Sequence, residues 1–384
     1  MKILLLGEYS GFFNSLKFGL TQLGHDVTLA GRKDGFKNFP VDISFEPVFL
    51  EKKAIKFFRK IYHRFFHSDV TSLEIFYIFW KQRAKFKDFD IVFLINEQSL
   101  TYNYYTEKKI LKFLFQHNKK VFLSACSDDV IYIDFLLNNG VPHHVLSEYV
   151  KDKSLFKHFQ YSLHYTKNSS KRLHEFIFEN IEAVIPGDYD YVLAYENHPK
   201  TTSLIPFPVR LHLLAYKPLV IEDKIIIFHG INKVNYYKKG NGYFEKALEI
   251  IQKKYADKIE IITAVSLPYE EYIEKYNRCH ILLDQAFAYD QGYNALEAMA
   301  KGKVVFTGAC EDWKNHYKVE EDSIVINAIP DADYMASKLE WLILHPEKIV
   351  EISKNARAFI EKEHDAVNSA EQYLYIWEQF SGKE

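Results

Sequence analysis

Short apolar runs alternate with helix-length segments along most of the chain, and this alternation constrains the fold more than any other feature. Alternating strands and helices are typical of βαβ units, which build parallel sheets covered by helices. The expected strands are residues 2–6, 26–30, 90–95, 120–124, 182–186, 224–229, 258–263, 280–284 and 303–307. The sequence therefore predicts an α/β protein.

The alternation is interrupted by the proline-containing segment 203–219, which has no clear period. A chain of 384 residues is longer than one core usually supports, so we predict two Rossmann-like domains facing each other across a cleft. We place the first domain at residues 1–210 and the second at 211–365. The last helical segment, 366–384, is expected to pack back on the first domain.

Charge and cysteine content limit the class of protein. The net charge of -2 excludes a globally basic nucleic-acid binder, and we expect no nucleic acid as partner. Cys126, Cys279 and Cys310 are odd in number and far apart, which fits a reducing compartment better than a disulfide framework. No apolar run is long enough for a signal peptide or a membrane span. We expect a soluble, cytoplasmic protein.

The stretch DQGYNALEAMAKGK, residues 290–303, places one carboxylate, Glu297, in a helix that is apolar on nearly every side. An ionised glutamate in a buried helix is costly unless it meets hydroxyls or a cation. Before the helix, Gly292 lets the backbone turn closely, so the amides of Gly292, Tyr293 and Asn294 form an anion site. A diphosphate at the helix start and a ribose held by Glu297 explain both features. The alternative is a glutamate on an exposed helix face.

A basic cluster follows the first strand of the second half, in HGINKVNYYKKGNGYFEKAL, residues 229–248. Lys233 and Lys239 stand at a strand-to-helix turn, where their ammonium groups can reach phosphate oxygens. Loop lysines are more often only solvated charges. Their place at the same end of the sheet as Gly292 favours the phosphate interpretation.

The first strand is also followed by a glycine-containing turn. Gly7 and Gly11 do not form the GxGxxG pattern of a dinucleotide site, and the second strand ends at Gly31 and Arg32 instead of an acid. These departures disfavour a nicotinamide-dependent enzyme.

The order of these parts resembles the retaining GT-B glycosyltransferases, a large family that includes bacterial mannosyl- and glucosyltransferases. The resembling pieces are the glycine turn with LGHDV at 23–27, the HGINK…KG loop, and YDQGYNALEAMAKGKVVFTG at 289–308. The resemblance covers essentially the whole chain and is strongest over residues 225–310. It implies the GT-B fold, in which two Rossmann-like domains face each other.

The resemblance also implies roles for single residues. Lys233 and Lys239 would neutralise the diphosphate of a nucleotide-sugar, and Glu297 would hold its ribose as the second acid of the family's Glu-x7-Glu motif. The other donor contacts expected from the strand-to-helix turns are Gly7, Gly230 and Asn232. The family usually has arginine where this chain has Lys233, and a lysine keeps the charge but loses the bidentate fork.

The first acid of that motif is absent, because Tyr289 stands at its position. In the family this acid contacts the sugar of the donor. Asp290, one residue later, is our candidate to replace it, and the alternative is a different sugar pocket.

On the acceptor side, SACSDDV at 124–130 occupies the place of the family's His-Asp-like step. Asp128 is the candidate acceptor ligand there. Asp128 and Asp129 are equally consistent with a helix cap. We see no cluster of acids with metal-ligand spacing, so neither a metal nor a separate cofactor is expected.

Residues 52–87 carry ten Lys or Arg, interleaved with aromatic residues, against Asp69 and Glu74. Ile55, Phe58, Tyr62 and Phe65 follow helical spacing, which favours an amphipathic helix with its aromatics in the core. The alternative is a peripheral patch on an anionic membrane that receives a lipid-linked sugar.

The sequence therefore predicts a glycosyltransferase that moves a sugar from a nucleotide-diphosphate-sugar to the hydroxyl of a saccharide or lipid-linked saccharide. The resemblance implies retention of configuration and a role in bacterial surface polysaccharide assembly (lipopolysaccharide, O-antigen or capsule). The alternatives are a sugar-nucleotide epimerase of the same shape and a non-catalytic nucleotide-sugar-binding protein.

Overall fold

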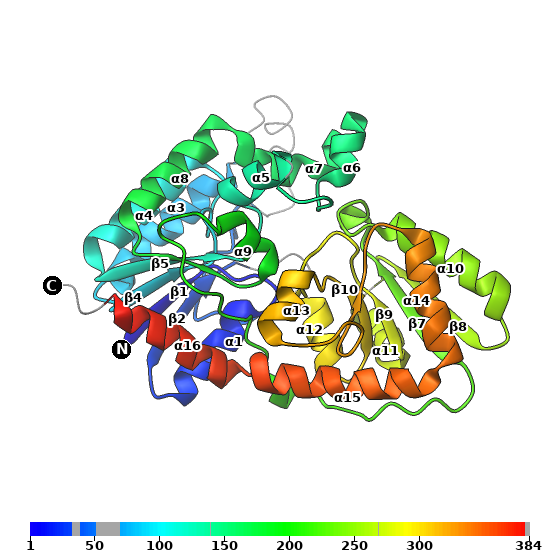
Figure 1. The fold of residues 1–384 in the computed structure, drawn as a ribbon. Helices are drawn as coiled ribbons and strands as arrows, with labels where there is room; N and C mark the ends of the chain where they lie inside the picture. The colour runs from blue at the N-terminus through cyan, green and yellow to red at the C-terminus, as the bar shows by residue number, and fades with distance from the viewer. Residues whose placement is uncertain (33–38, 51–69, 139, 268, 381–384) are drawn as a thin grey trace.

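The computed structural model describes residues 1–32, 39–50, 70–138, 140–267 and 269–380, which form two lobes side by side (Figure 1). Each lobe is built on one parallel sheet with helices on both faces. A strand overlaps each of the runs expected to be strands. The predicted α/β class with two Rossmann-like domains is confirmed.

The sheet of the first lobe has six parallel strands. Their order is β3 (Ile43–Ser44), β2 (Asp26–Gly31), β1 (Lys2–Leu6), β4 (Ile91–Leu94), β5 (Lys120–Ala125) and β6 (Val184–Pro186). Alternate side chains of β1 point to opposite faces, so Ile3 and Leu5 enter one core while Leu4 and Leu6 enter another. Both faces are buried, which is why these strands are continuous apolar runs.

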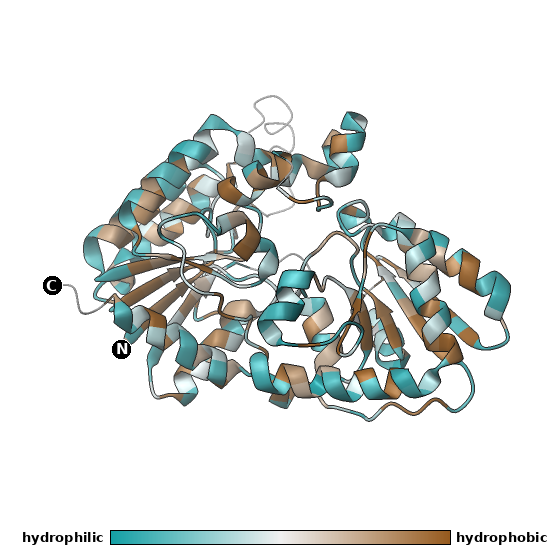
Figure 2. Ribbon diagram, in the orientation of Figure 1, coloured by the Kyte–Doolittle hydropathy of each residue, from teal (hydrophilic) through white to brown (hydrophobic). Residues whose placement is uncertain are grey.

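Helices cover both faces of this sheet (Figure 1). α1 (Phe12–Gln22) and α16 (Ala366–Gln379) share a core with Ile3 and Leu5, and α3 (Thr71–Gln82), α4 (Tyr104–His117) and α8 (Asn168–Asn180) pack on the opposite face. Shorter helices surround the carboxyl ends of β5 and β6, namely α5 (Val130–Leu137), α6 (Ser147–Lys151), α7 (Phe156–Leu163) and α9 (Tyr189–Tyr195). Figure 2 shows the result, with hydrophobic strands inside and hydrophilic outer faces on the helices.

The sheet of the second lobe has five parallel strands. Their order is β11 (Ile326–Asn327), β10 (Val304–Thr307), β9 (Ile281–Leu283), β7 (Ile225–Ile231) and β8 (Ile259–Val265). α10 (Asn241–Tyr255) and α14 (Ala332–Leu344) pack on one face. The other helices of this lobe are α11 (Tyr269–Arg278), α12 (Tyr293–Ala300), α13 (Glu311–Tyr317) and α15 (Pro346–Glu363). β3 and β11 were not predicted, because two-residue edge strands carry too short a pattern.

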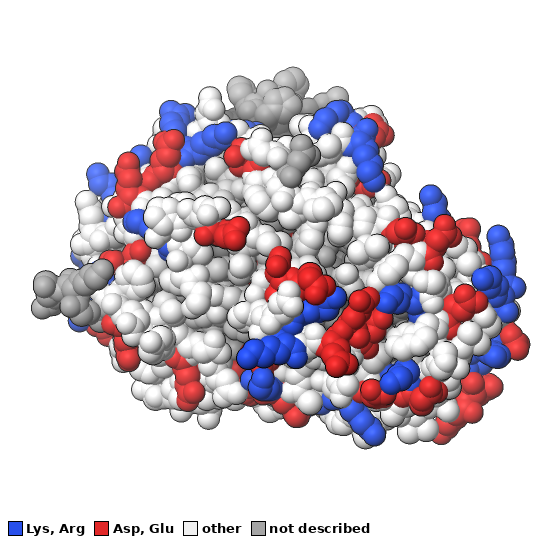
Figure 3. All heavy atoms as spheres, viewed as in Figure 1, with Lys and Arg blue, Asp and Glu red and all other residues white. Residues whose placement is uncertain are grey.

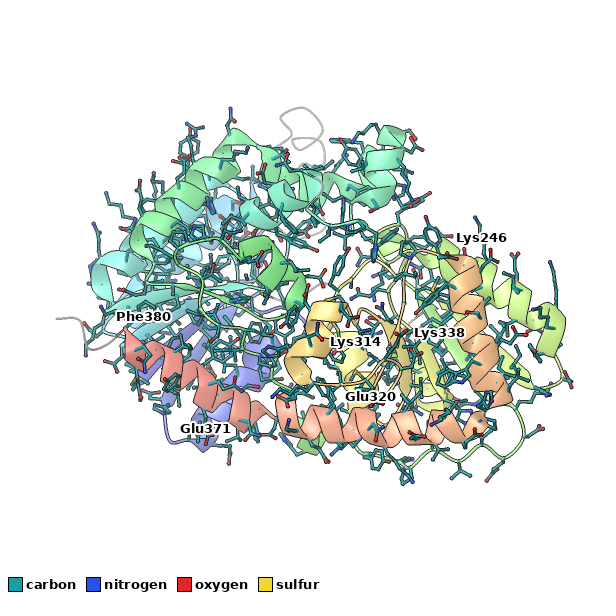
Figure 4. All side chains as sticks on the ribbon, in the orientation of Figure 1. Lys246, Lys314, Glu320, Lys338, Glu371 and Phe380 are labelled. Atoms are coloured by element: carbon teal, nitrogen blue, oxygen red, sulfur yellow. The ribbon has the colours of Figure 1, made fainter. Side chains whose placement is uncertain are left out.

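The chain passes between the lobes twice, and the two passes lie side by side. The amide of Val209 donates to the carbonyl of His364 at 2.7 Å, and Nδ1 of His364 donates to the carbonyl of Phe207 at 2.9 Å. After the second pass, α16 packs against α1 of the first lobe. Figure 4 labels Glu371 on this helix and Phe380 at its C-cap, and the helix lies over the first lobe.

The contact between α1 and α16 depends on Gly19. A Cβ at this position would lie 2.0 Å from the carbonyl oxygen of Ala366 and 2.8 Å from the Cβ of Ala370. Since neither backbone nor a short side chain can yield, a larger residue must push the two helices apart.

We expect Gly19→Ala to lower the melting temperature and cost about 1 to 3 kcal/mol, through overpacking. Gly242→Ala is the control, because a Cβ in that helix would meet only the Tyr236 hydroxyl oxygen, at 3.3 Å. It should be neutral or stabilising by up to about 1 kcal/mol. Equal melting temperatures for the two variants would contradict the proposed close contact.

The histidine between the passes makes stability depend on pH. Burial lowers the pKa of His364 to about 4, whereas an exposed histidine titrates near about 6.5. Between these values the unfolded chain binds a proton that the folded chain does not, so the free energy of unfolding falls as the pH is lowered.

From pH 7 to pH 5 we expect this residue to account for a loss of about 2 kcal/mol. His364→Asn keeps a donor toward Phe207 but cannot titrate, so its stability should fall less over that range. His345→Asn, at an exposed helix end, should behave as the wild type. Urea unfolding at both pH values measures the difference, and parallel pH profiles for wild type and His364→Asn would refute it.

Candidate functional site

The carboxyl ends of the strands of both lobes border one cavity of about 240 Å³. The first lobe contributes Tyr9 and Ser10 after β1 and Asp188 after β6, and the second contributes Gly292 and Tyr293 at the start of α12. Strand order reverses between β1 and β4 and between β7 and β9, and open α/β sheets bind ligands at such switch points. In Figure 3 the outline is notched between the lobes, and acidic and basic side chains are interspersed without a continuous field of one sign.

Asp284, directly after β9, joins two of the predicted residues. Its Oδ1 atom accepts a hydrogen bond from Lys239 Nζ at 2.7 Å and another from Asn294 Nδ2 at 2.8 Å. The Asp284 side chain is almost fully buried, at 2% exposure, whereas the Lys239 side chain is 26% exposed. A cation is therefore held beside the start of α12 by a carboxylate that solvent hardly reaches.

The first turn of α12 is open to a ligand. Its N-cap, Gly292, has an extended backbone, and no side chain caps the helix. A Cβ at Gly292 would meet only Gln285 Nε2 among the described residues within 4 Å, at 3.7 Å, so local packing does not require a glycine here. The missing side chain leaves the amides at the helix start accessible to an anion.

Glu297 lies one turn further along α12. The five apolar neighbours named by the sequence pattern are buried, namely Ala295, Leu296, Ala298, Met299 and Ala300, while Glu297 itself is half-buried. Burial, followed by the charge of Glu297, raises the pKa of Tyr276, which places the carboxylate near α11. Glu297 is therefore not on a fully exposed helix face.

The other predicted residues of the β7 turn are more exposed. Lys233 begins the turn η5 (Lys233–Asn235). Among the described residues, the side chains that donate to Asp284 are those of Lys239 and Asn294, and Lys233 does not join them. Asn232 Oδ1 accepts from the amide of Val234 at 3.0 Å. A Cβ at Gly230 would lie 2.9 Å from the Tyr272 ring, so that glycine has a packing role.

Gly7 differs from the expectation of a donor contact. Its φ of +98° favours glycine, and an added Cβ would lie 2.1 Å from Ile95 Cγ2. The fold therefore requires glycine here without any ligand. The residues of this turn that reach the cavity are Tyr9 and Ser10.

Asp290 is not among the residues that line the cavity, although we expected it to contact the sugar of the donor there. Its Oδ2 atom accepts from the amide of Tyr189 in the first lobe at 2.9 Å, and its Oδ1 atom accepts from the amide of Gln291 at 2.7 Å. In return, Asp190 Oδ2 accepts from the amide of Tyr289 at 3.0 Å. Burial raises the pKa of both carboxyl groups. Asp290 connects the lobes instead of contacting a sugar in the cavity.

The paired aspartates after β5 have separate roles. Asp129 caps α5 through the amide of Tyr132 at 2.7 Å, which is the cap alternative for that residue. Asp128 Oδ2 lies 3.0 Å from Lys238 Nζ of the second lobe and is not among the cavity residues. Asp128 therefore forms a cross-lobe ion pair, where we had expected an acceptor ligand.

Sequence reasoning missed Asp188 and Asp190, which border the cavity from the β6–α9 turn. The signal was present in PGDYD, residues 186–190, where acids follow a strand that had been identified. It also missed Asp284, the last residue of the predicted strand 280–284.

The first half of the basic aromatic segment 52–87, residues 52–69, lies outside the described residues and includes Ile55, Phe58 and Tyr62. In the described part, α3 buries Ile75 and Phe79. Its opposite face exposes Leu73, Tyr77 and Trp80. Over the portions of the chain that the structure covers, no helix has the length and hydropathy needed to cross a bilayer.

A measurement of folding stability distinguishes a structural role of Asp290 between the lobes from a role in binding a ligand. Asp290→Ala leaves two backbone amides without their acceptor and should cost about 1 to 3 kcal/mol. Asp331→Ala removes the cap of α14, an ordinary helix N-terminus, and should cost about 1 kcal/mol or less. Thermal denaturation compares the two, and an Asp290→Ala loss no larger than that of Asp331→Ala would contradict the cross-lobe role.

Comparison with known proteins gives a family match for part of the chain. Residues 234–375 match the family described as Glycosyl transferase-like. A search among curated protein sequences finds no match.

Solved structures of similar fold cover nearly the whole chain. Sucrose-phosphate synthase from Thermosynechococcus elongatus is 14% identical with a TM-score of 0.59, over 100% of both chains. HepE from Anabaena, solved with UDP-glucose, is 12% identical with a TM-score of 0.57, over 99% of this chain and 100% of that one. A glycosyltransferase from Rickettsia africae is 12% identical with a TM-score of 0.52, over 100% of this chain and 98% of that one. At these identities the likeness establishes the shared fold.

Proposed function

We propose that this chain, a GT-B glycosyltransferase by its fold and by the family that its C-terminal lobe matches, transfers a sugar from a nucleotide-diphosphate-sugar to an acceptor hydroxyl. The observation that carries the donor assignment is the Asp284 cluster, in which Lys239 and Asn294 meet beside the uncapped start of α12. A cation and a helix N-terminus at one switch point suit a diphosphate.

Catalysis on this proposal consists of stabilising the leaving diphosphate. Lys239 and the amides at the start of α12 are in place before the reaction, so their dipoles and charge need little reorganisation as negative charge develops. Asp284 keeps Lys239 oriented toward α12 when no donor is bound. The departing diphosphate takes the electron pair of the bond between the sugar carbon and the phosphate oxygen. The acceptor oxygen forms the new bond to that carbon, and its proton passes to the departing phosphate oxygen.

Glu297 is the proposed partner of the ribose. It lies one helical turn, or about 5.4 Å, beyond the start of α12, which is a suitable separation between a phosphate at the helix start and the hydroxyls of the attached sugar. The two oxygens of the Glu297 carboxylate can each accept a hydrogen bond from a ribose hydroxyl. The UDP-glucose complex of HepE makes UDP-sugars the first donors to test.

The finer parts of the proposal rest on the resemblance of residues 225–310 to retaining enzymes. They are retention of configuration, with attack from the face of the leaving group, and a role in surface polysaccharide assembly.

A peripheral membrane contact is supported by one face of α3. Leu73, Tyr77 and Trp80 are 61%, 65% and 46% exposed, and Arg83 lies over the Trp80 ring at 4.7 Å. Apolar side chains beside cations suit the interface of an anionic bilayer. A lipid-linked acceptor would be presented there.

Donor binding tests the proposal. Thermal-shift screening against UDP-, GDP-, ADP-, CMP- and dTDP-sugars should reveal one that raises the melting temperature, because a ligand of the folded state stabilises it. By calorimetry, Lys239→Ala and Glu297→Ala should each raise the Kd of that donor about tenfold or more, since charge-assisted bonds are lost. Lys239→Ala should also lower turnover by more than about tenfold.

Lys246→Ala is the matched control, because Lys246 is an exposed lysine on α10, labelled in Figure 4. It should leave affinity and turnover unchanged. The donor assignment would be contradicted if no nucleotide-sugar stabilised the protein, or if the two lysine variants had equal effects. Product formed without any acceptor would identify an epimerase, and binding without turnover over a broad acceptor panel would identify a non-catalytic binding protein.

A further inference from the structure

Arg32, the residue that follows β2, lies where three turns of the first lobe meet. A Cβ added to Gly31 would lie 3.1 Å from the carbonyl carbon of Gly7, and one added to Gly7 would lie 3.3 Å from the carbonyl oxygen of Ser99. The turns after β2, β1 and β4 are therefore packed against one another. From its place after β2, Arg32 Nη1 donates to the carbonyl of Leu100 at 3.4 Å, in the segment that follows β4.

This hydrogen bond carries the guanidinium of Arg32 over the carboxyl end of β1, because β1 lies between β2 and β4 in the sheet. Strand order reverses between β1 and β4, and open α/β sheets bind ligands at such a place. The same β1 turn contributes Tyr9 and Ser10 to the cavity between the lobes. Arg32 therefore stands beside the cleft, on the first lobe.

The positive charge of Arg32 is not neutralised by a neighbour. Within the described part of the chain, its guanidinium pairs with no carboxylate. Its Nε atom is buried without a hydrogen-bond partner there, while the residue as a whole is half-buried. Arginine keeps its charge in proteins, so a partly buried guanidinium without a counter-charge favours the approach of an anion.

Two other charged groups beside the cleft already have partners. Glu8, on the β1 turn, accepts backbone amides at the start of α1 through both of its carboxylate oxygens, each at 2.9 Å. This carboxylate compensates the dipole of α1, so the first turn of that helix is not open to another anion. Lys238, which enters from the second lobe, pairs with Asp128 at 3.0 Å. An anion at this edge of the first lobe therefore meets Arg32.

The acids of the cavity wall lie on a different turn. Asp188 and Asp190 follow β6, which stands four positions from β2 in the sheet, or about 19 Å at the usual spacing of strands. Charges that far apart act weakly on each other through solvent. They do not cancel the attraction of Arg32 for an anion.

We infer that Arg32 binds an anionic group of the acceptor, a phosphate or a carboxylate, at the rim of the cleft. The inference rests on the proposed function, which assigns the diphosphate of the donor to Lys239 and the start of α12 in the second lobe. The anion that meets Arg32 then belongs to the other substrate. Its charge lies either on the acceptor sugar or on the phosphate of a lipid carrier, since both present the same oxygens to a guanidinium.

Saturation-transfer NMR on the full-length protein tests this assignment with matched pairs of probes. Glucose 6-phosphate against glucose, and galacturonate against galactose, carry the charge on the sugar. Farnesyl phosphate against farnesol, in a neutral detergent, carries the charge on a lipid. In at least one pair the anionic probe should bind about tenfold or more tightly than its neutral partner, and that pair identifies the source of the anion.

Arg32→Gln should remove this difference, because glutamine keeps an amide donor but carries no charge. Arg32→Lys should keep part of it, since lysine retains the charge and loses the bidentate fork. Both effects should persist in a Lys239→Ala background, in which the anion site of the second lobe has lost its cation. Arg172→Gln, which replaces an exposed arginine on α8, is the matched control and should keep the wild-type difference.

The inference would be overturned if no anionic probe bound better than its neutral partner, if the preference survived Arg32→Gln, or if Arg172→Gln removed it as well. Should Arg32→Gln fail to fold, Arg32→Lys decides, and an undiminished preference in that variant counts against the inference.

The same variants separate this inference from the proposed function. Arg32→Gln should leave the Kd of the nucleotide-sugar unchanged, and a weakened donor would place Arg32 at the donor and overturn its assignment to the acceptor. Failure of every nucleotide-sugar to stabilise the protein would instead overturn the proposed function, because the probes of the acceptor contain no nucleotide.

Discussion

The exchange of hydrogen bonds between Asp190 and Asp290 holds the two lobes in register. Each carboxylate receives a backbone amide from the other lobe, at 3.0 and 2.9 Å. Burying two acids close together is unfavourable, and the raised pKa of each reflects that cost. The cost is tolerated because the amides are satisfied in the same contact, and because the arrangement fixes the β6–α9 turn at the cavity. The position of Asp188 follows from this contact.

In the second lobe, an ion pair within the lobe holds the Lys239 side chain in one orientation. A free lysine in a cleft would lose side-chain entropy on binding and would be hard to orient. Asp284 orients Lys239 toward Asn294, and β7 and β9 are adjacent in the sheet, so the two turns are fixed by the strands themselves. On the proposed function, the affinity of the diphosphate for this place depends on how readily it replaces Asp284 as the partner of Lys239.

The sequence was sufficient for those features that depend on local pattern. The strands, the buried helix 293–301 and the glycine turn before it follow from periodicity and turn chemistry. The roles of Asp290 and Asp128 did not follow, since each depends on a partner about a hundred residues away in the other lobe. Nor could spacing show that Lys238 and Lys239, adjacent in the chain, pair with different lobes. Gly7 resembled a ligand contact because a tight turn and a phosphate loop both require glycine.

The two passes between the lobes are hydrogen-bonded to each other through Val209 and His364. If the lobes separate about these passes, the bonds that break are those that span the cleft, including the ion pair of Lys238 with Asp128. The bonds of Lys239 and Asn294 to Asp284 lie within one lobe and survive. The contacts of Asp284 therefore need only the second lobe, whereas the cavity is bordered by residues of both lobes. On the proposed function, this asymmetry predicts an order of events, in which the diphosphate binds before the lobes close on the rest of the donor.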